Sequence, residues 1–214
     1  GRRVSHVFMV DIPAYPKLLA ITDAAINITP DLNAKAQILE NAIALSSLLG
    51  IETPKAAVLS TVETVNPAIA STLDAACLAL MAKRGQVAGA IVDGPMAFDN
   101  AISADAAREK GIISAVAGDV DILLVPDLVS GNILAKNLEY LADATAAGVV
   151  MGLSAPVVLS SRADPPAARL AALALAVLMH RPTPPRSQQP RRGEPESAIH
   201  CAVQPEAACC PMGT

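Results

Sequence analysis

Short runs of β-branched and aliphatic residues alternate along the chain with longer segments in which apolar side chains recur at helical spacing. The short runs predict buried strands and the longer segments predict helices. The predicted strands are 7–11, a buried stretch within 18–26, 56–59, 88–92, 122–125, 149–151 and 156–159. The predicted helices are 30–49, 71–84, 103–110, 131–141 and 164–179. Alternating strands and helices imply crossover connections, so the pattern predicts an α/β fold with a mainly parallel sheet.

The first long helix has recognisable end signals. Thr29 suits the N-cap, Pro30 suits the first turn, and Asp31 suits the positive end of the helix dipole. Gly50 follows the last apolar position, Leu49, and suits the end of the helix. We therefore expect Thr29 to cap a helix that ends at Leu49.

The segment 181–214 has a different character from the rest of the chain. It is polar and aperiodic, and it holds seven of the 17 prolines. Such a segment cannot bury enough apolar surface to offset the entropy lost on ordering. We expect a disordered, proline-rich tail. A proline-based ligand for an aromatic-lined module is the alternative.

Composition limits the classes of protein that fit. Apolar residues make up 52% of the chain and aromatic residues only 2%, which suits a sheet covered by Ala-rich helices. A net charge of −4 argues against binding to nucleic acid or to an anionic membrane. No run reaches the roughly 18 apolar residues of a membrane-spanning helix. We therefore expect a cytoplasmic protein with no nucleic-acid or membrane partner.

The four cysteines have neither zinc-ligand spacing nor the spacing of a disulfide framework. Cys77 lies among Ala and Leu in a helical pattern, so we expect a small core residue there. The other three cysteines lie in the predicted tail, and we assign them no role. The glycine pattern contains neither of the two common nucleotide-binding loops.

Three polar islands follow predicted strands: residues 92–100, 126–132 and 159–164. Each island leads into a predicted helix. In α/β proteins the ends of parallel strands and the N-termini of the following helices meet at one edge of the sheet, where ligands bind. The three islands therefore predict a single cleft at this edge.

The third island offers Ser161, Arg162 and Asp164. The guanidinium of Arg162 matches a phosphate or carboxylate, and the Ser161 hydroxyl can donate to a developing oxyanion. With the free N–H groups of the following helix, these residues form a candidate anion site. Alternatively, Asp164 caps the helix, and Ser161 and Arg162 are a polar strand end with a surface ion pair.

The first island brackets a Gly94-Pro95 turn with Asp93 on one side and Asp99 and Asn100 on the other. A tight turn would hold both acids on one rim, where a carboxylate can act as a general base or orient an arginine. The alternative is that Asp99 caps a helix and Asp93 braces the turn.

The second island offers Asp127, Gly131 and Asn132 as a similar rim. Gly131 allows close approach of a backbone, and Asn132 supplies donors and an acceptor. Together with Asp93 and Asp99, Asp127 could supply oxygen ligands to a divalent metal. Because the spacing follows no metal-binding motif, we expect no metal.

Five segments, taken together, resemble the phosphate acetyltransferase/phosphate butyryltransferase family. They are 21–26, 92–102, 116–128, 130–133 and 161–164, in order and at natural spacing. The Ser-Arg-Ala-Asp sequence at 161–164 is closer to the butyryltransferase-like branch.

The resemblance implies two α/β domains with an isocitrate/isopropylmalate dehydrogenase-like architecture. Residues 1–7 would be a junction, 8–149 the second domain, 150–180 the C-terminal part of the first domain, and 181–214 the tail. On this mapping the chain is N-terminally truncated. The resemblance also implies a homo-oligomer.

The implied reaction transfers an acyl group between coenzyme A and inorganic phosphate, without a covalent enzyme intermediate or a bound cofactor. Arg162 would hold the phosphoryl group, Ser161 would bond to the reacting centre, and residues of the first two islands would line the opposing rim. Coenzyme A is a substrate. The family's general base maps to Ala168, so Asp164 is the candidate substitute.

Three hypotheses follow. The first is an acyltransferase, with the expectation that this chain alone is weakly active or inactive. The second is a non-catalytic α/β remnant that serves as a binding or dimerisation module. The third is a metal-dependent dehydrogenase on the related architecture.

Overall fold

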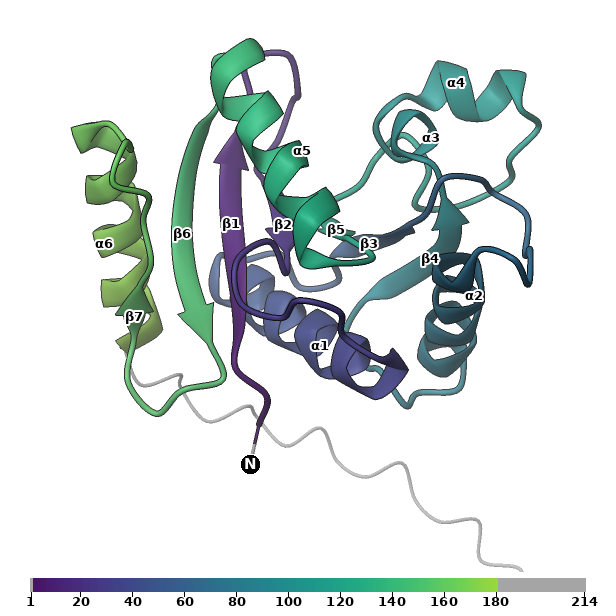
Figure 1. The fold of residues 1–214 in the computed structure, drawn as a ribbon, viewed down its shortest axis with the longest axis horizontal. Coiled ribbons are helices and arrows are strands. Elements are labelled where there is room, and N and C mark those ends of the chain that lie inside the picture. The colour runs from purple at the N-terminus through teal and green to yellow at the C-terminus, as the bar shows by residue number, and fades with distance from the viewer. Residues whose placement is uncertain (1, 181–214) are drawn as a thin grey trace, which may run out of the picture. The chain divides into compact units, whose positions relative to one another are not determined.

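The computed structural model describes residues 2–180, which form a single seven-stranded sheet flanked by helices (Figure 1). The strands lie in the order β4-β3-β5-β2-β1-β6-β7. Their bounds are β1 Ser5–Asp11, β2 Leu19–Thr22, β3 Lys55–Leu59, β4 Ile91–Met96, β5 Ile122–Leu124, β6 Thr145–Met151 and β7 Val157–Val158. The helices are α1 Leu32–Leu48, α2 Ala70–Lys83, α3 Phe98–Ile102, α4 Ala104–Glu109, α5 Leu128–Leu141 and α6 Pro166–His180. The α/β class is therefore confirmed, and the predicted tail lies outside the described residues.

The sheet is mixed: β2 to β6 share one direction, as the predicted mainly parallel sheet requires, and β1 and β7 run the opposite way. Strands β2, β5, β3 and β4 are parallel neighbours, whereas β1 pairs antiparallel with both β2 and β6. The connection between β1 and β2 is too short for a helical crossover, so β2 must turn back along β1. Strand β7 is antiparallel to β6. Consequently β2 to β6 all end at one edge of the sheet, and β7 ends at the opposite edge.

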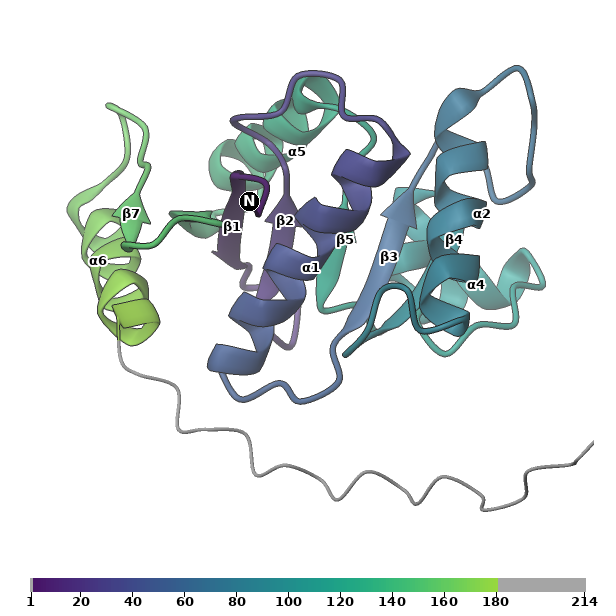
Figure 2. The same ribbon diagram turned by 90° about the horizontal axis from the view of Figure 1, so that it is seen from below.

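The helices cover both faces of the sheet (Figure 2). Helices α1 and α2 pack on one face over a core that includes Val58, Ile122 and Leu124. Helices α3 and α5 pack on the other face, over a core that includes Leu59 and Leu123. The helix that follows β3 therefore lies on the opposite face from the helix that follows β5. The ends of β3 and β5 form a topological switch point, the place where α/β sheets commonly bind ligands.

Two helices begin at residues other than those predicted. The N-cap of α1 is Asp31 rather than Thr29, because the Asp31 carboxylate accepts a hydrogen bond from the Ala34 N–H at 2.7 Å. Helix α5 begins at Leu128 rather than at Gly131 because Asp127 caps it. In both cases an aspartate nearer the apolar run captures the free N–H groups of the first turn.

Cys77 is exposed on α2, so the prediction that it is a core residue is wrong. The buried residues of α2 are Thr72, Ala75 and Leu78, which recur every third position. Cys77 falls outside this stripe. Alanine occurs on both the buried and the exposed face of this helix. The composition around Cys77 therefore does not indicate on which face the thiol lies.

His6 is fully buried in β1 and links the centre of the sheet to the segment after β7. Its Nε2 lies 3.2 Å from the Leu159 carbonyl oxygen. Because a carbonyl can only accept, Nε2 carries the proton. Burial lowers the pKa of His6, and this outweighs the opposing effects of the Leu159 carbonyl and the carboxylates of Asp23 and Asp164.

Gly148 in β6 makes this contact possible. A Cβ at position 148 would lie 2.6 Å from His6 Nε2 and closer still to the Leu159 carbonyl oxygen. A side chain there would therefore push β7 and the turn that follows it away from β6.

We predict that Gly148→Ala destabilises the protein by about 1–3 kcal/mol, because the methyl group overpacks a site closed by backbone. Urea unfolding followed by circular dichroism measures the change. Thr145→Ala, at an exposed position of the same strand, is the control and should change stability by less than about 0.5 kcal/mol. Equal unfolding midpoints for Gly148→Ala and the control would contradict the prediction.

Candidate functional site

The Ser161–Asp164 segment forms a turn between β7 and α6. The Asp164 carboxylate accepts a hydrogen bond from the Ser161 N–H at 2.6 Å, and the Asp164 N–H donates to the Ser161 carbonyl at 3.2 Å. These two bonds close the turn upon itself. Within residues 2–180 no helix N–H donates to Asp164, so the alternative of Asp164 as a helix cap is not what the structure shows.

The exposure of the three side chains suits an anion site. Arg162 is exposed, Ser161 is half-buried and Asp164 is buried. Helix α6 has 15 residues and begins directly after this turn. Pro166 has no N–H, so the donors of its first turn that lack partners within the helix are the N–H groups of Ala167 and Ala168, which add positive potential. The turn can therefore present a guanidinium and a hydroxyl beside a helix N-terminus.

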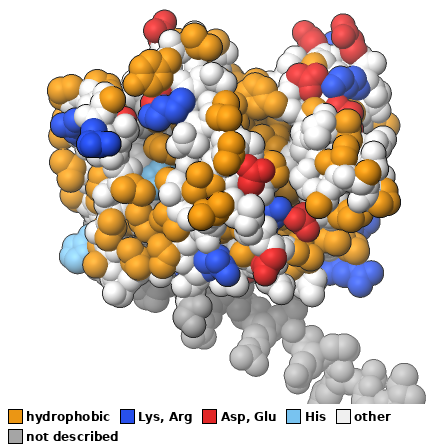
Figure 3. Space-filling view, viewed as in Figure 1, with side chains coloured by type: hydrophobic (Ala, Val, Ile, Leu, Met, Phe, Trp, Pro, Cys, Tyr) orange, Lys and Arg blue, Asp and Glu red, His pale blue; other side chains and the backbone are white. Residues whose placement is uncertain are grey.

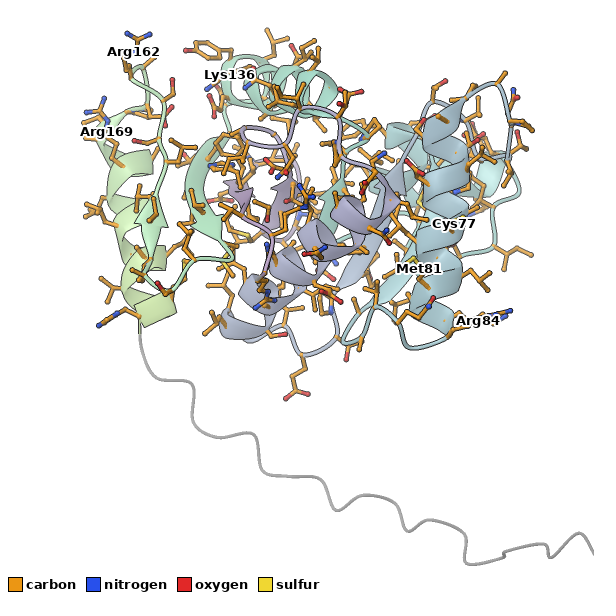
Figure 4. The ribbon with its side chains drawn as sticks, turned by 60° about the horizontal axis from the view of Figure 1, so that its bottom comes forward. Cys77, Met81, Arg84, Lys136, Arg162 and Arg169 are labelled. Carbon is orange, nitrogen blue, oxygen red and sulfur yellow. The ribbon has the colours of Figure 1, made fainter. Side chains whose placement is uncertain are left out.

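Two further cations lie near this turn, and sequence reasoning missed both. Arg169 of α6 donates from Nη2 to the Arg162 carbonyl oxygen at 2.9 Å. Lys136 of α5 has its Nζ 4.0 Å from Asp164 Oδ1 and 2.5 Å from Glu139 Oε2. Figure 4 shows Arg162 and Arg169 together on the α6 side, with Lys136 across from them. A cavity of about 160 Å³, lined by Asp164, Glu139 and residues of α5, β6 and α6, lies between the two helices.

The three islands do not meet at one edge of the sheet. The first two islands follow β4 and β5, which are parallel and end at the same edge. The third island follows β7, which runs the opposite way to β6 and therefore ends at the other edge. The prediction of a single cleft within this chain is wrong. The prediction assumed that the strand before the third island runs parallel to the other two, but β7 runs antiparallel to β6.

The Gly94-Pro95 pair lies inside β4 and does not form the predicted tight turn. Proline is tolerated there because β4 is an edge strand. A Cβ at Gly94 would lie 2.7 Å from the Val58 carbonyl oxygen, so glycine is needed for β4 to approach β3. Asp93 accepts from the Gly94 N–H at 2.8 Å and lines a hollow between α2 and β4. It therefore lies apart from Asp99.

Asp99 and Asn100 belong to α3 and form part of an ion-pair cluster. Lys110 lies 2.8 Å from both Asp99 Oδ2 and Glu63 Oε1, and the buried Asn100 side chain donates to Glu63. The N-cap of α3 is Ala97, so the alternative of Asp99 as a cap is wrong. The Lys110 ammonium lowers the pKa of Asp99 and the pKa of Glu63. The cluster ties the loop after β3 to α3 and α4.

The second island has structural contacts of its own. Asp127 Oδ1 accepts from the Ser130 N–H at 2.8 Å as the cap of α5. A Cβ at Gly131 would lie 2.6 Å from Val125 Cγ2, so this glycine lets α5 pack on β5. Asn132 is exposed, and its amide lies 3.4 Å from the Ala24 carbonyl oxygen.

A second cavity, of about 340 Å³, lies at the topological switch point. We call it the switch-point cavity and define it by its lining: Leu59, Ser60, Thr61, Ser71, Phe98, Val125, Pro126, Ser130 and Leu134. The surface is hollowed between α5 and the α3–α4 segment (Figure 3). Ser60 and Thr61 belong to the loop after β3, which is not among the three predicted polar islands. A signal was available, since that loop follows a buried strand in the way the islands do.

Residues 2–180 contain no group of three or more His, Cys, Asp or Glu side chains arranged to hold a metal ion. Within the same range, no helix combines the length and the apolar character needed to cross a bilayer.

The fold and the turn define an α/β protein with a candidate anion-binding segment before α6. The family model Phosphate acetyl/butaryl transferase matches residues 1–177. The chain is 56% identical over 177 residues to the phosphate acetyltransferase of Rhizobium meliloti, covering 83% of this chain and 56% of that protein. It is 51% identical over 174 residues to the probable phosphate butyryltransferase of Bacillus subtilis, covering 81% of this chain and 58% of that protein.

A solved structure agrees with these relatives. The branched-chain phosphotransacylase of Enterococcus faecalis V583 superposes with a TM-score of 0.76 at 36% identity, covering 82% of this chain and 63% of that one. The chain therefore belongs to the phosphate acetyl/butyryl transferase family. It spans just over half the length of the two relatives above. The comparisons support the transferase hypothesis. They do not support the alternatives of an inactive chain or a non-catalytic remnant.

We predict that Lys110→Met raises the pKa of both Asp99 and Glu63 towards ordinary carboxyl values. The ammonium lowers both values, so its contribution to stability is present above the ordinary carboxyl pKa and is lost as pH falls through the lowered values. NMR titration of the carboxyl carbons measures the shifts. Arg108→Met removes a neighbouring cation that pairs with Asp105, and it should leave both pKa values unchanged. Unaltered titrations in Lys110→Met would show that the cluster does not form in solution.

Proposed function

We propose that the protein transfers an acyl group between coenzyme A and inorganic phosphate. The observation that carries the proposal is the exposed Arg162 beside Ser161 at the start of α6, in a chain that matches the family over residues 1–177. The relatives act on acetyl and butyryl groups by name, and their identities to this chain are similar. Acyl-CoA and phosphate, or acyl phosphate and CoA, are the proposed substrate pairs.

The chemistry requires charge to be offset at phosphate. When acyl phosphate is the acyl donor, the CoA thiolate attacks the carbonyl carbon of the acyl group. A C–S bond forms, and the bond between that carbon and the phosphate oxygen breaks. The departing phosphate takes the electron pair of that bond. Arg162 suits this step because its planar fork can make two parallel hydrogen bonds to phosphate oxygens. Ser161 can donate to the oxygen on which charge develops, and the free N–H groups of α6 favour the same anion.

Asp164 suits the role of a positioning residue better than that of the general base considered from the sequence. It is buried, and one carboxylate oxygen already accepts from the Ser161 N–H at 2.6 Å. Its other oxygen faces Lys136 at 4.0 Å. We infer that Asp164 fixes the backbone of the turn and so sets where the Ser161 hydroxyl and the Arg162 guanidinium lie.

We also propose that residues 8–149 and 150–180 belong to different domains of an isocitrate/isopropylmalate dehydrogenase-like protein. The support is an apolar surface on α6 and β7, visible at the left of Figure 3. Its exposed residues are Val157, Leu159, Leu170, Leu173 and Val177. A surface of this kind marks a site of contact with other protein.

Two expectations stay predictions. One is substrate binding by the first two islands: Asp93, Gly94, Pro95, Asp99, Asn100, Asp127, Gly131 and Asn132. The other is self-association of the protein, which analytical ultracentrifugation can check.

We predict phosphate-dependent release of CoA from acetyl-CoA or butyryl-CoA. Arg162→Lys should lower kcat/KM by about 10- to 100-fold, because a lysine keeps the charge and loses the bidentate geometry. Arg84→Ala on α2, far from the turn in Figure 4, is the control and should leave the rate unchanged.

The assay has two arms. One uses residues 1–214 and the other uses the same chain fused to the part of the Rhizobium meliloti relative that the match leaves uncovered. CoA release in either arm supports the proposal. A folded protein that releases no CoA in both arms would refute it.

We predict that Asp164→Asn keeps kcat within about tenfold of the parent protein, because the amide oxygen still accepts from the Ser161 N–H. Asp164→Ala should lower kcat further, since it leaves that N–H without its partner. The shape of the pH–rate profile should be the same in both variants. Loss of the acidic limb of the profile in Asp164→Asn would instead identify Asp164 as the general base.

A further inference from the structure

Helix α5 carries a lysine whose ammonium group lies beside the Ser161 turn. Lys136 belongs to the C-terminal half of α5, and its Nζ lies 2.5 Å from Glu139 Oε2 and 5.9 Å from the centre of the Tyr140 ring. Both partners come from α5 itself, and the second contact suits a cation–π interaction. The helix therefore holds the ammonium in place, across from Arg162 and Arg169 in Figure 4.

The backbone that carries Lys136 has a fixed position in the fold. Ala135, the residue before it, is 1% exposed and belongs to the core on that face of the sheet. Gly131, one turn earlier, lets α5 approach Val125 closely. Because these contacts set the place of α5 on the sheet, the ammonium of Lys136 extends from a rigid support.

Asp164, on the other side of the contact, is a buried carboxylate. Its side chain is 8% exposed, and its Oδ1 lies 4.0 Å from Lys136 Nζ. A buried carboxylate is unfavourable unless it is both hydrogen-bonded and paired with a cation. Its Oδ2 accepts from the Ser161 N–H, and its only ion pair within residues 2–180 is the one with Lys136. The counter-charge of this carboxylate therefore comes from α5.

The ion pair joins the turn to α5 at a place where packing is incomplete. A cavity of about 160 Å³ lies between α5 and α6, and Glu139, Tyr140 and Asp164 all line it. Side chains that border a cavity lack contacts on one side and gain less from dispersion. The attraction between Lys136 and Asp164 acts across this gap, in surroundings where charges are screened less than in water.

We propose that Lys136 is a positioning residue for the acyl transfer. Its ammonium holds the Asp164 carboxylate, and through Asp164 it sets the place of the backbone that carries Ser161 and Arg162. The effect on the rate rests on the proposed function, whereas the effect on the turn rests on the contacts alone. A guanidinium that is already in place makes its two hydrogen bonds to phosphate with a smaller loss of entropy.

The first experiment measures the turn without any substrate. Hydrogen exchange of the Ser161 amide, followed by NMR on residues 1–214, reports how often its hydrogen bond to Asp164 opens. Lys136→Met keeps the apolar stem and removes the charge, so it should lower the protection of this amide about tenfold. A larger loss is not expected, because the lysine side chain is 33% exposed and the pair is partly screened. Lys136→Gln should behave like Lys136→Met, and Lys136→Arg should restore the protection.

Two further variants serve as controls for this measurement. Glu139→Gln removes the partner that Lys136 has on its own helix and keeps the ammonium, so the protection of the Ser161 amide should not fall. Lys83→Met removes an exposed charge in the last turn of α2 and should leave the protection unchanged. Equal losses in Glu139→Gln and Lys136→Met would overturn the inference, because the lysine would then act only through the stability of α5.

The second experiment is a double-mutant cycle on the rate. In the protein arm that shows transfer, Lys136→Met should lower kcat/KM for phosphate about tenfold, and Lys136→Arg should bring it back to within about threefold of the parent. In an Asp164→Asn background, Lys136→Met should change kcat/KM by less than about twofold, because a neutral amide needs no counter-charge. Lys83→Met should leave the rate unchanged in both backgrounds.

The results separate this role from direct contact with substrate and from the proposed function. A lysine that contacts phosphate itself would lower kcat/KM by the same factor in both backgrounds, and this result would overturn the inference while acyl transfer stands. Unchanged protection of the Ser161 amide in Lys136→Met would also overturn it. Lost protection in a chain that shows no transfer in any protein arm would support the link between Lys136 and the turn and refute the acyltransferase.

Discussion

Strand β1 is the constraint on which the rest of the structure depends. It is buried over six of its seven residues and pairs antiparallel with β2 on one side and β6 on the other. Because both neighbours must run opposite to it, they run parallel to each other and to β5, β3 and β4. The direction of β6 in turn fixes β7, which is antiparallel to it. The place of Ser161 therefore follows from the pairing of β1, which is Ser5–Asp11, near the other end of the described residues.

A buried contact strengthens this dependence. His6 of β1 reaches across β6 to the Leu159 carbonyl oxygen, and the lack of a side chain at Gly148 leaves room for it. Because burial lowers the pKa of His6 and so favours the neutral imidazole, the contact is compatible with the buried centre of the sheet. The turn that carries Arg162 is thus held from two directions: by β1 through Leu159 and by its own Asp164. A guanidinium on a flexible turn would lose entropy when it binds phosphate, and such a support reduces that loss.

The sequence was a good guide to features that depend on local pattern. It predicted most of the strands and the long helices, because apolar periodicity reflects which face of each element is buried. It failed where distant segments decide the outcome. Strand β7 runs opposite to β6, whose direction is set by its pairing with β1. Gly94 packs against Val58, so the Gly94-Pro95 pair lies inside a strand instead of forming a turn. Cys77 lies outside the buried stripe of α2, which its Ala-rich surroundings did not reveal. The residues of the switch-point cavity come from six separate elements and loops, so no single motif marks them.

The Ser161 turn and the switch-point cavity lie at opposite edges of the sheet. This has a physical consequence for any ligand that contacts both. Helix α5 lies between them, and its position is fixed by Gly131, whose missing side chain lets the helix approach Val125 and Ala24. The length of α5 and its distance from the sheet therefore set the distance between the Ser161 turn and the switch-point cavity that such a ligand must span. A ligand that matches this separation gains two contacts for a single loss of translational freedom, in the same way as linked binding modules do.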